Sequence, residues 1–308
     1  MTPRAALRRP PLEEWLAGRR GETEAALLRV LPAAGEPLAD AMRYSVLAGG
    51  KRLRPILALT LYDVCGGAGP VPSEVAEAAA ALELLHTYSL IHDDLPCMDD
   101  DTLRRGRPTC HVVHGEAMAL LAGDALQTLG FELLATRPSG EAAAPRRAEA
   151  VALLARAIGA SGMAGGQALD LAAQGSVRRG AGAADRLREI HEKKTGRLLQ
   201  ASAELGAVLA GAPPARRGLV ARYGALLGLL FQIADDLLDV TASADALGKT
   251  AGKDAAQEKL TYPALFGLAG ARAERDRVLA EALEAAGAVE GGSGVLSELA
   301  RYAAHRDR

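Results

Sequence analysis

Two acidic segments, far apart along the chain, each follow a strongly apolar stretch. The first, HDDLPCMDDDTLRRGR, covers residues 92–107 and places five aspartates within nine residues. The second, QIADDLLD at residues 232–239, ends an apolar stretch that begins YGALLGLLF. Ionised carboxylates in apolar surroundings must be paired, bound to a metal or placed at the mouth of a cavity. We therefore interpret the two segments as opposite walls of one cation site.

The residue types in these segments favour magnesium and phosphate. Mg²⁺ prefers hard oxygen ligands and shares its coordination sphere between a few carboxylates and the phosphates of a substrate. The first segment also carries Arg104, Arg105 and Arg107, whose planar guanidinium groups suit phosphate oxygens. In the second segment, Asp235 and Asp239 are four residues apart and therefore share one face of a helix. A solvated, charged helix end is the simpler alternative for the first segment taken alone.

The rest of the sequence predicts an all-α, single-domain protein that spans residues 1–308. Alanine and leucine dominate, aromatic residues make up 3%, and no convincing period-two strand pattern occurs. Ser73 is expected to cap the helix that leads to the first acidic segment. The predicted helices cover residues 21–48 with an interruption from Pro32 to Pro37, 55–63, 73–94, 114–136, 147–173, 184–210, 216–240 and two further stretches separated at 291–294.

Charge, cysteine content and hydropathy exclude several classes of protein. A formal net charge of −2 provides no basic footprint for nucleic acid. Three cysteines without paired spacing indicate reduced thiols, so we expect a cytoplasmic protein. The N-terminus lacks the apolar core of a signal peptide, and the longest apolar run, Tyr223 to Ala234, is too short to span a bilayer. We therefore expect no integral membrane segment.

Familiar catalytic arrangements are missing from the sequence. It offers no assembly of Ser, His and Asp, and no Gly-Lys-Ser/Thr phosphate loop follows a strand. If diphosphate is the leaving group, no nucleophile is needed, because Mg²⁺ stabilises the departing charge and an apolar cavity shelters the resulting carbocation. The segment 241–261, with Lys249, Lys253 and Lys259, would then cover the bound phosphates, or it is an ordinary solvated loop.

Several stretches give the sequence a specific resemblance to a known family. They are GGKRLRP, HTYSLIHDDLPCMDDDTLRRGRPTCH, GEAMALLAGDALQ, GMAGGQALDL, HEKKTGRLL, FQIADDLLD and LGKTAGKD with the following EKLTYPALFG. In this order they resemble the motifs of trans-polyprenyl diphosphate synthases over most of residues 40–270, and look closest to the short-chain bacterial type. The resemblance implies a helical bundle around a central cavity, a homodimer, and head-to-tail condensation of isopentenyl diphosphate with an allylic diphosphate.

The resemblance also implies a role for each matching residue. Two or three Mg²⁺ ions would be held by Asp93, Asp94, Asp99, Asp235 and Asp239. The allylic diphosphate and the cation beside it would be bound by Arg104, Lys194, Thr195, Gln232, Lys249 and Lys259, and the first four of these would be catalytic. Isopentenyl diphosphate would be bound by Lys51, Arg54, His86 and Arg105. An unbroken helix would align Asp100 with Asp93 better than Asp99, but Pro96 disrupts the backbone, so Asp99 rests on the resemblance.

The length of the product is predicted from the residues before Asp93. Tyr88 lies five residues earlier, about 7.5 Å along a helix, where a bulky side chain would form a floor below the growing chain. In the family that the sequence resembles, an aromatic residue there goes with a C15 product, so we predict farnesyl diphosphate. The small Ser89 keeps geranylgeranyl diphosphate as the alternative. A class I terpene cyclase, which would need no second diphosphate site, and a non-catalytic helical partner subunit are further alternatives.

Overall fold

The protein is an all-α bundle in a computed structural model that describes residues 11–67, 69–173, 182–241, 260–290 and 294–305. The predicted fold class is therefore confirmed. The helices are α1 (Leu12–Val30), α2 (Pro37–Val46), α3 (Leu53–Val64), α4 (Ser73–Asp93), α5 (Cys110–His114), α6 (Glu116–Thr136), η1 (Glu141–Ala143), α7 (Ala144–Ile158), α8 (Met163–Ala173), α9 (Ala183–His191), η2 (Glu192–Gly196), α10 (Arg197–Leu209), α11 (Pro214–Thr241), α14 (Tyr262–Glu290) and α15 (Val295–Ala304).

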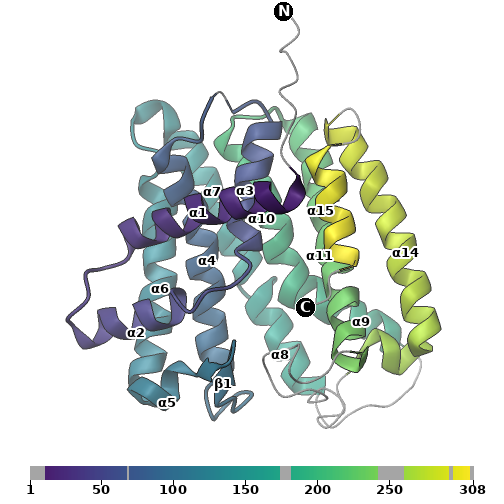
Figure 1. Ribbon diagram of the computed structural model, residues 1–308, viewed down its shortest axis with the longest axis horizontal. Helices are drawn as coiled ribbons and strands as arrows, with labels where there is room; N and C mark the ends of the chain where they lie inside the picture. The colour runs from purple at the N-terminus through teal and green to yellow at the C-terminus, as the bar shows by residue number, and fades with distance from the viewer. Residues whose placement is uncertain (1–10, 68, 174–181, 242–259, 291–293, 306–308) are drawn as a thin grey trace, which may run out of the picture.

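Helix α10 lies between two hydrophobic cores. One core joins α10 to α1, α2, α4, α6 and α7, and the other joins it to α3, α11, α14 and α15. Figure 1 shows these long helices side by side, with α1 crossing over α3 and α4. Leu198 belongs to the first core and Leu199 to the second, so consecutive residues of α10 are buried on different sides. Helix α10 is therefore apolar on the two sides that face the cores, whereas Gln200 and Glu204 lie on a half-buried third side.

Two helix boundaries differ from the prediction. Helix α1 begins at Leu12, nine residues before the predicted start at residue 21, because polar residues on its exposed side obscure the pattern of its four buried positions. The predicted helix 147–173 is two helices, α7 and α8, separated by residues 159–162. A Cβ on Gly162 would lie 2.0 Å from the carbonyl oxygen of Ala157, so the close turn between the helices requires glycine at this position.

A short hairpin, absent from the prediction, follows the first acidic segment. Strands β1 (Leu103–Arg104) and β2 (Arg107–Pro108) pair antiparallel. The turn between them consists of Arg105 and Gly106, both with positive φ, as type I′ turns require. Strands of two residues carry no period-two pattern, so a search for alternating polarity cannot find them.

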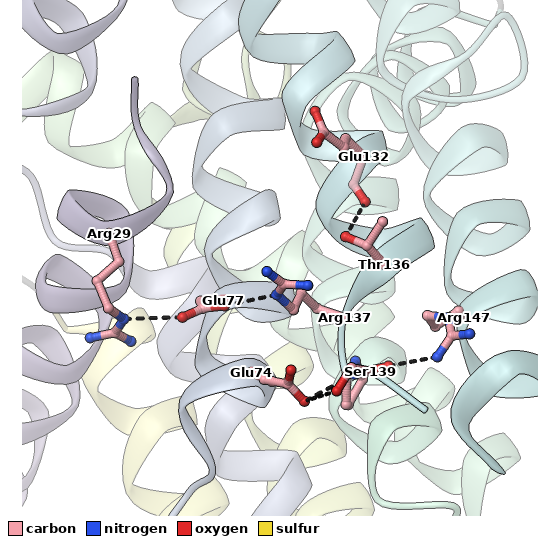
Figure 2. Close-up of polar contacts among 9 residues, drawn as sticks. Arg29, Glu74, Glu77, Glu132, Thr136, Arg137, Ser139 and Arg147 are labelled. Atoms are coloured by element: carbon pink, nitrogen blue, oxygen red, sulfur yellow. Dashed lines mark hydrogen bonds and ion pairs between the residues drawn. The ribbon is translucent and has the colours of Figure 1, made fainter. Parts of the chain in front are cut away.

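The predicted cap of α4 by Ser73 is wrong. Ser73 is the first residue of the helix itself, Pro72 precedes it in an extended conformation, and no side chain caps this end. The next residue, Glu74, instead accepts hydrogen bonds at Oε2 from the backbone nitrogen of Ser139, at 2.9 Å, and from its hydroxyl, at 3.0 Å. The start of α4 is therefore tied to the segment that follows α6 (Figure 2).

A second glutamate fixes the same end of α4. Oε1 of Glu77 accepts a hydrogen bond from Nε of Arg29 on α1, and Oε2 accepts one from Nε of Arg137 after α6, both at 3.0 Å (Figure 2). One carboxylate thus joins three parts of the bundle. Because α4 is anchored at its N-terminal end, its C-terminal end at Asp93 is held at a defined place in the bundle.

Helix α6 combines an apolar composition with a partly exposed surface. Of the described helices, it is the one whose length and composition would allow it to cross a membrane. It nevertheless packs along α4 and α2 and contributes Leu126 and Leu134 to the first core, as a core helix of a globular protein does. On its outer side, Leu120 and Leu121 are 47% and 51% exposed.

Candidate active site

The four residues that the resemblance assigns to isopentenyl diphosphate line one pocket of about 370 Å³. Lys51 lies two residues before α3 and Arg54 in its first turn, His86 comes from α4, and Arg105 from the turn of the hairpin. We call this the cationic pocket. Phe231 of α11 and the buried carboxylate of Glu83 complete its wall.

A buried ion pair shapes the turn that carries the cations. Arg52 has a left-handed backbone conformation, with φ 52°, and is 3% exposed. Its Nη1 donates to Oε1 of Glu83 at 2.7 Å, and its Nη2 donates to the carbonyl oxygen of Val46 at 2.7 Å. Arg52 lines the pocket together with Lys51 and Arg54, and its pair with Glu83 holds it against the pocket wall. The glutamate was missed from the sequence, although it lies three residues before His86 and so on nearly the same face of α4.

The electrostatics of the cationic pocket favour a dianion. Burial lowers the pKa of Arg54 to about 10, against the opposing effects of Glu83 and Asp235. Burial and the neighbouring arginines lower the pKa of His86 well below its usual value, so this imidazole is neutral at pH 7. Four cationic side chains, Lys51 and three arginines, line the pocket, and Glu83 is the one carboxylate in its lining. The neutral imidazole of His86 adds a dipole but no charge. A diphosphate would offset this excess of positive charge.

A second, more apolar pocket of about 410 Å³ adjoins the first. We call it the apolar cavity. Its wall is formed by Tyr88, Ser89 and Asp93 of α4, by Met163, Ala164, Gln167, Ala168 and Leu171 of α8, and by Lys194 and Thr195 of η2. Arg54 and His86 line both pockets, so they form the boundary where the contents of the two pockets would meet.

A π-helical turn brings Lys194 and Thr195 into the apolar cavity. This turn, η2, interrupts the helical run from α9 to α10. Two glycines allow it to pack closely: a Cβ on Gly166 would lie 2.2 Å from the backbone nitrogen of Lys194, and one on Gly228 would lie 2.9 Å from Cα of Gly196. The glycine-rich stretch of α8 is therefore a helix-packing feature, as its lack of a following Gly-Lys-Ser/Thr indicated. Single-turn π-helices are frequent at functional sites.

Asp93 is the carboxylate that lines the rim of the apolar cavity. Burial raises the pKa of Asp93 to about 6; Lys194 opposes the shift, and Asp99 adds to it. Among the described residues, no three His, Cys, Asp or Glu side chains converge closely enough to hold a metal on their own.

Lys194 has a partner that sequence reasoning missed. Its Nζ donates to Oδ2 of Asp170 at 2.6 Å, which links η2 to α8. Asp170 lies in the motif GMAGGQALDL, where an acid in an otherwise apolar stretch was the available signal. The pair fixes the ammonium group at the rim of the apolar cavity, where it also acts on Asp93.

Several predicted residues take other positions. Asp94 and Arg104 bind each other, with Nε of Arg104 2.8 and 2.9 Å from the two carboxylate oxygens, and both line a separate, small pocket beside the hairpin. Arg107 stacks 4.6 Å from the ring centre of Tyr44. Asp99 donates its backbone N–H to the carbonyl oxygen of Asp93 at 2.9 Å, which keeps these two residues adjacent despite the break at Pro96.

The second acidic segment contributes both to the site and to the core. Asp235 raises the pKa of Arg54, so its carboxylate acts on the boundary between the two pockets. It follows Phe231 of the cationic pocket by four residues and shares that face of α11. Asp239 lies one turn further along and is half-buried. Lys249 and Lys259 lie outside the described residues.

Asp236, between these acids, is a structural residue of the core. It is 4% exposed and accepts hydrogen bonds from Nε2 of Gln232 at 3.1 Å and from the backbone nitrogen of Tyr262 at 2.9 Å. Nε2 of the buried His191 lies 3.7 Å from the same carboxylate. Asp236 therefore joins α11 to the start of α14 and to the end of α9, and Gln232 is held on it.

His191 makes the stability of the protein sensitive to acid. Burial lowers the pKa of His191 to about 3 from 6.5, so only the unfolded state binds a proton between these values. The free energy of unfolding should therefore fall by up to about 1.4 kcal/mol per pH unit as the pH decreases below about 6.5. We expect His191→Gln to flatten this slope in urea titrations between pH 6.5 and 4.5. Exposed His305→Gln serves as the control, and parallel curves for all three proteins would contradict the prediction.

Comparison with known proteins identifies the family. The family model for polyprenyl synthetases matches residues 36–292. The chain belongs to the polyprenyl synthetase family. The predicted resemblance to trans-polyprenyl diphosphate synthases is therefore confirmed, and with it the coarser functional assignment of this polyprenyl synthetase as a prenyltransferase.

The relatives of this polyprenyl synthetase are named for prenyl diphosphate products of different lengths. Geranylgeranyl pyrophosphate synthase 12, chloroplastic, of Arabidopsis thaliana is 47% identical over 268 residues, which cover 86% of this chain and 73% of the relative. The heterodimeric geranylgeranyl pyrophosphate synthase large subunit 1, chloroplastic, of the same plant is 48% identical over 251 residues, or 80% and 65% of the two chains. The structure of an FPP/GFPP synthase from Zymomonas mobilis matches with a TM-score of 0.80 and 33% identity, and covers 95% and 98% of the two chains.

Proposed function

We propose that this polyprenyl synthetase joins isopentenyl diphosphate head to tail to an allylic diphosphate, in a reaction that requires Mg²⁺. The observation that carries the proposal is the contact between two unlike pockets. One is cationic and suits a diphosphate, the other is apolar with an acidic rim, and Arg54 and His86 line both. A terpene cyclase would have no use for the first pocket, and a non-catalytic partner subunit would have no use for either.

Different residues bind the two diphosphates, assist the departure of the allylic diphosphate and keep water away from the carbocation. Lys51, Arg54 and Arg105 hold the diphosphate of the isopentenyl substrate, and neutral His86 donates a hydrogen bond to it. Lys194, at the rim of the apolar cavity, binds the allylic diphosphate from the opposite side. When bound by Asp93, Asp99, Asp235 and Asp239, Mg²⁺ would stabilise the charge on the departing diphosphate. The apolar wall keeps water from the carbocation, and the released diphosphate accepts the proton.

The names of the plant relatives favour geranylgeranyl diphosphate as the main product. These relatives are 47% and 48% identical to this chain and are named for that C20 product. Farnesyl diphosphate is the second candidate, because Tyr88 lines the apolar cavity and is 8% exposed. Its ring packs edge-on against His92 at 5.7 Å, which limits its movement.

A product assay tests the function directly. The protein is incubated with Mg²⁺, isopentenyl diphosphate and dimethylallyl, geranyl or farnesyl diphosphate, and the hydrolysed products are separated by chromatography. Chain elongation that stops without Mg²⁺ is expected, with C20 alcohol as the main species. Elongation that ends at C15 would favour the second candidate. Release of diphosphate without a longer chain would identify a cyclase, and no turnover would identify a partner subunit.

The floor of the apolar cavity should set the length of the product. We expect Tyr88→Ala to extend the main product by at least one C5 unit beyond that of the unchanged protein, because the truncation opens space below Asp93 at the position of a buried ring. Tyr302→Ala on α15 removes the same group outside the cavity and should leave the distribution of chain lengths unchanged. Identical products from the Tyr88 variant and the unchanged protein would refute the floor.

We also propose that the protein is a cytoplasmic homodimer that contacts its copy through α5 and α6. Val112, Val113, Leu120 and Leu121 on these helices are between 47% and 51% exposed, which is costly for a monomer. Leu120→Glu with Leu121→Glu should yield a monomer in light scattering, whereas Leu28→Glu on α1, where Leu28 is 53% exposed, should not. A monomeric unchanged protein would contradict this. The free thiols of Cys65, Cys97 and Cys110 support the location.

A further inference from the structure

Two arginines with a strained backbone meet at the carboxylate of Glu83. Arg52, just before α3, and Arg105, in the hairpin turn, have φ values of 52° and 54°, a region that few residues other than glycine adopt. Nη1 of Arg52 lies 2.7 Å from Oε1 of Glu83, and Nη2 of Arg105 lies 3.9 Å from the same oxygen. One buried oxygen on α4 therefore joins the turn before α3 to the hairpin.

Arg105 is also held against the turn before α3 by direct contacts. Its Nη1 donates to the carbonyl oxygen of Gly49. A Cβ on Gly50 would lie 2.7 Å from Cζ of Arg105, so the guanidinium group packs directly on the backbone of this glycine. Arg52 fixes the same turn from its other end, because its Nη2 donates to the carbonyl oxygen of Val46 at 2.7 Å. The place of Arg105 in the cationic pocket therefore depends on the shape of this turn.

Stability alone is a poor explanation for the pair of Arg52 and Glu83. The two side chains are 1% and 3% exposed, so both charges have lost their hydration. In buried pairs this loss can exceed the attraction between the charges, and replacing both residues by apolar ones is often neutral or stabilising. Backbone strain of the kind found at Arg52 and Arg105 clusters at functional sites. The geometry that the pair imposes on the cationic pocket explains it better.

We propose that the pair of Arg52 and Glu83 positions the residues that bind isopentenyl diphosphate. Both terminal nitrogens of Arg52 are bound within the protein, so the pair acts through its neighbours and not on the ligand. It fixes the turn that carries Lys51 and Arg54, and the carboxylate attracts Arg105 to that turn. Binding groups that are already ordered lose less freedom when the ligand arrives, which increases affinity. The inference rests on the proposed function and deepens it for this substrate.

The test replaces the pair by apolar residues of similar size. The double variant Arg52→Met with Glu83→Leu removes both charges together, so its melting temperature should stay close to that of the unchanged protein. Calorimetric titration with isopentenyl diphosphate alone should nevertheless give a Kd that is about 10- to 100-fold higher, the loss seen when groups that orient the ligands of a metal are removed. The KM for this substrate should rise in parallel, whereas kcat and the KM for the allylic diphosphate should change little.

A conservative variant and a matched control accompany the double variant. Glu83→Asp keeps the charge but withdraws the carboxylate by one methylene, so it should raise the Kd for isopentenyl diphosphate about 10-fold and tests the inference even if the double variant does not fold. Arg217→Met with Glu149→Leu removes an ion pair between α11 and α7 by the same exchanges. Neither of these two residues lines the cationic pocket or the apolar cavity, so the Kd should stay unchanged.

The outcomes separate this inference from the proposed function. If the unchanged protein elongates prenyl chains but the Glu83→Asp and double variants bind isopentenyl diphosphate as tightly as it does, the pair serves stability alone and the inference is wrong. Equal losses of affinity for both substrates would show a general disturbance of the site and would also overturn the inference. If the unchanged protein neither binds isopentenyl diphosphate nor elongates an allylic diphosphate, the proposed function itself fails.

Discussion

Asp93→Asn is expected to lower kcat/KM by about 10²- to 10³-fold, the usual effect of removing one electrostatic stabiliser of a transition state. An amide is a weaker magnesium ligand than a carboxylate, so part of the activity should return at high Mg²⁺ concentration. Asp235→Asn should behave in the same way, because we propose that Asp235 holds the same Mg²⁺ ions as Asp93. Steady-state kinetics over a range of Mg²⁺ concentrations measure both effects.

The stability of the Asp93→Asn variant should change in the opposite direction. Burial and neighbouring acids raise the pKa of Asp93 to about 6, so its charged form is unfavourable in the protein without ligands. Removing that charge should raise the melting temperature measured without Mg²⁺ or substrate. Asp94→Asn should lower it, because this exchange breaks the pair with Arg104. Asp276→Asn, on the exposed side of α14, is the control for both measurements. Equal activity of the Asp93 and Asp276 variants would contradict the assignment of the metal site.

Gly166→Ala is expected to disable the site by displacing the π-helical turn. The new methyl group would lie 2.2 Å from the backbone nitrogen and 2.6 Å from Cα of Lys194, and neither atom belongs to a flexible side chain that can move aside. Overpacking of this kind lowers the free energy of unfolding by about 1–3 kcal/mol. A displacement of about 1 Å at Lys194 and Thr195 would lower kcat by about 10²-fold. Urea denaturation and product assays measure the two effects.

The matched control is Gly218→Ala in α11. A methyl group at this position would meet no described atom within 4 Å. Alanine is the better helix former, so this variant should gain about 0.5–1 kcal/mol of stability and keep full activity. If Gly166→Ala matched Gly218→Ala in both measurements, the turn would not depend on close packing against α8.

The parts of the site that were predictable are those written in contiguous sequence. The acidic segment after α4 and the turn GGKRLRP each combine several charged residues in a few positions, which can be seen in the sequence without knowledge of the fold. The positions of Tyr88 and Asp93 followed from helix geometry because α4 is an unbroken helix. The all-α class could be predicted from composition, because composition is an average over long stretches of the chain and does not depend on single contacts.

The remaining contacts could not be predicted because each depends on how distant helices pack. Lys194 and Asp170 are 24 residues apart and meet only because a glycine lets α8 approach η2. Arg104 was expected at phosphate, but the hairpin that carries it turns its guanidinium toward Asp94. The split between α7 and α8 depends on one tight turn, and helical periodicity alone does not detect such a break.

The shared wall of Arg54 and His86 has a consequence for inhibitor design. A synthetic molecule with an anionic group at each end of a short apolar spacer would occupy the cationic pocket and the apolar cavity at the same time. Once one end is seated, the other binds intramolecularly, which can improve avidity by about 10²- to 10⁴-fold over either half alone. Tyr88 lines the apolar cavity and not the cationic pocket. A substitution of Tyr88 would therefore change which spacer lengths fit, while the cationic pocket would still bind the second anionic group.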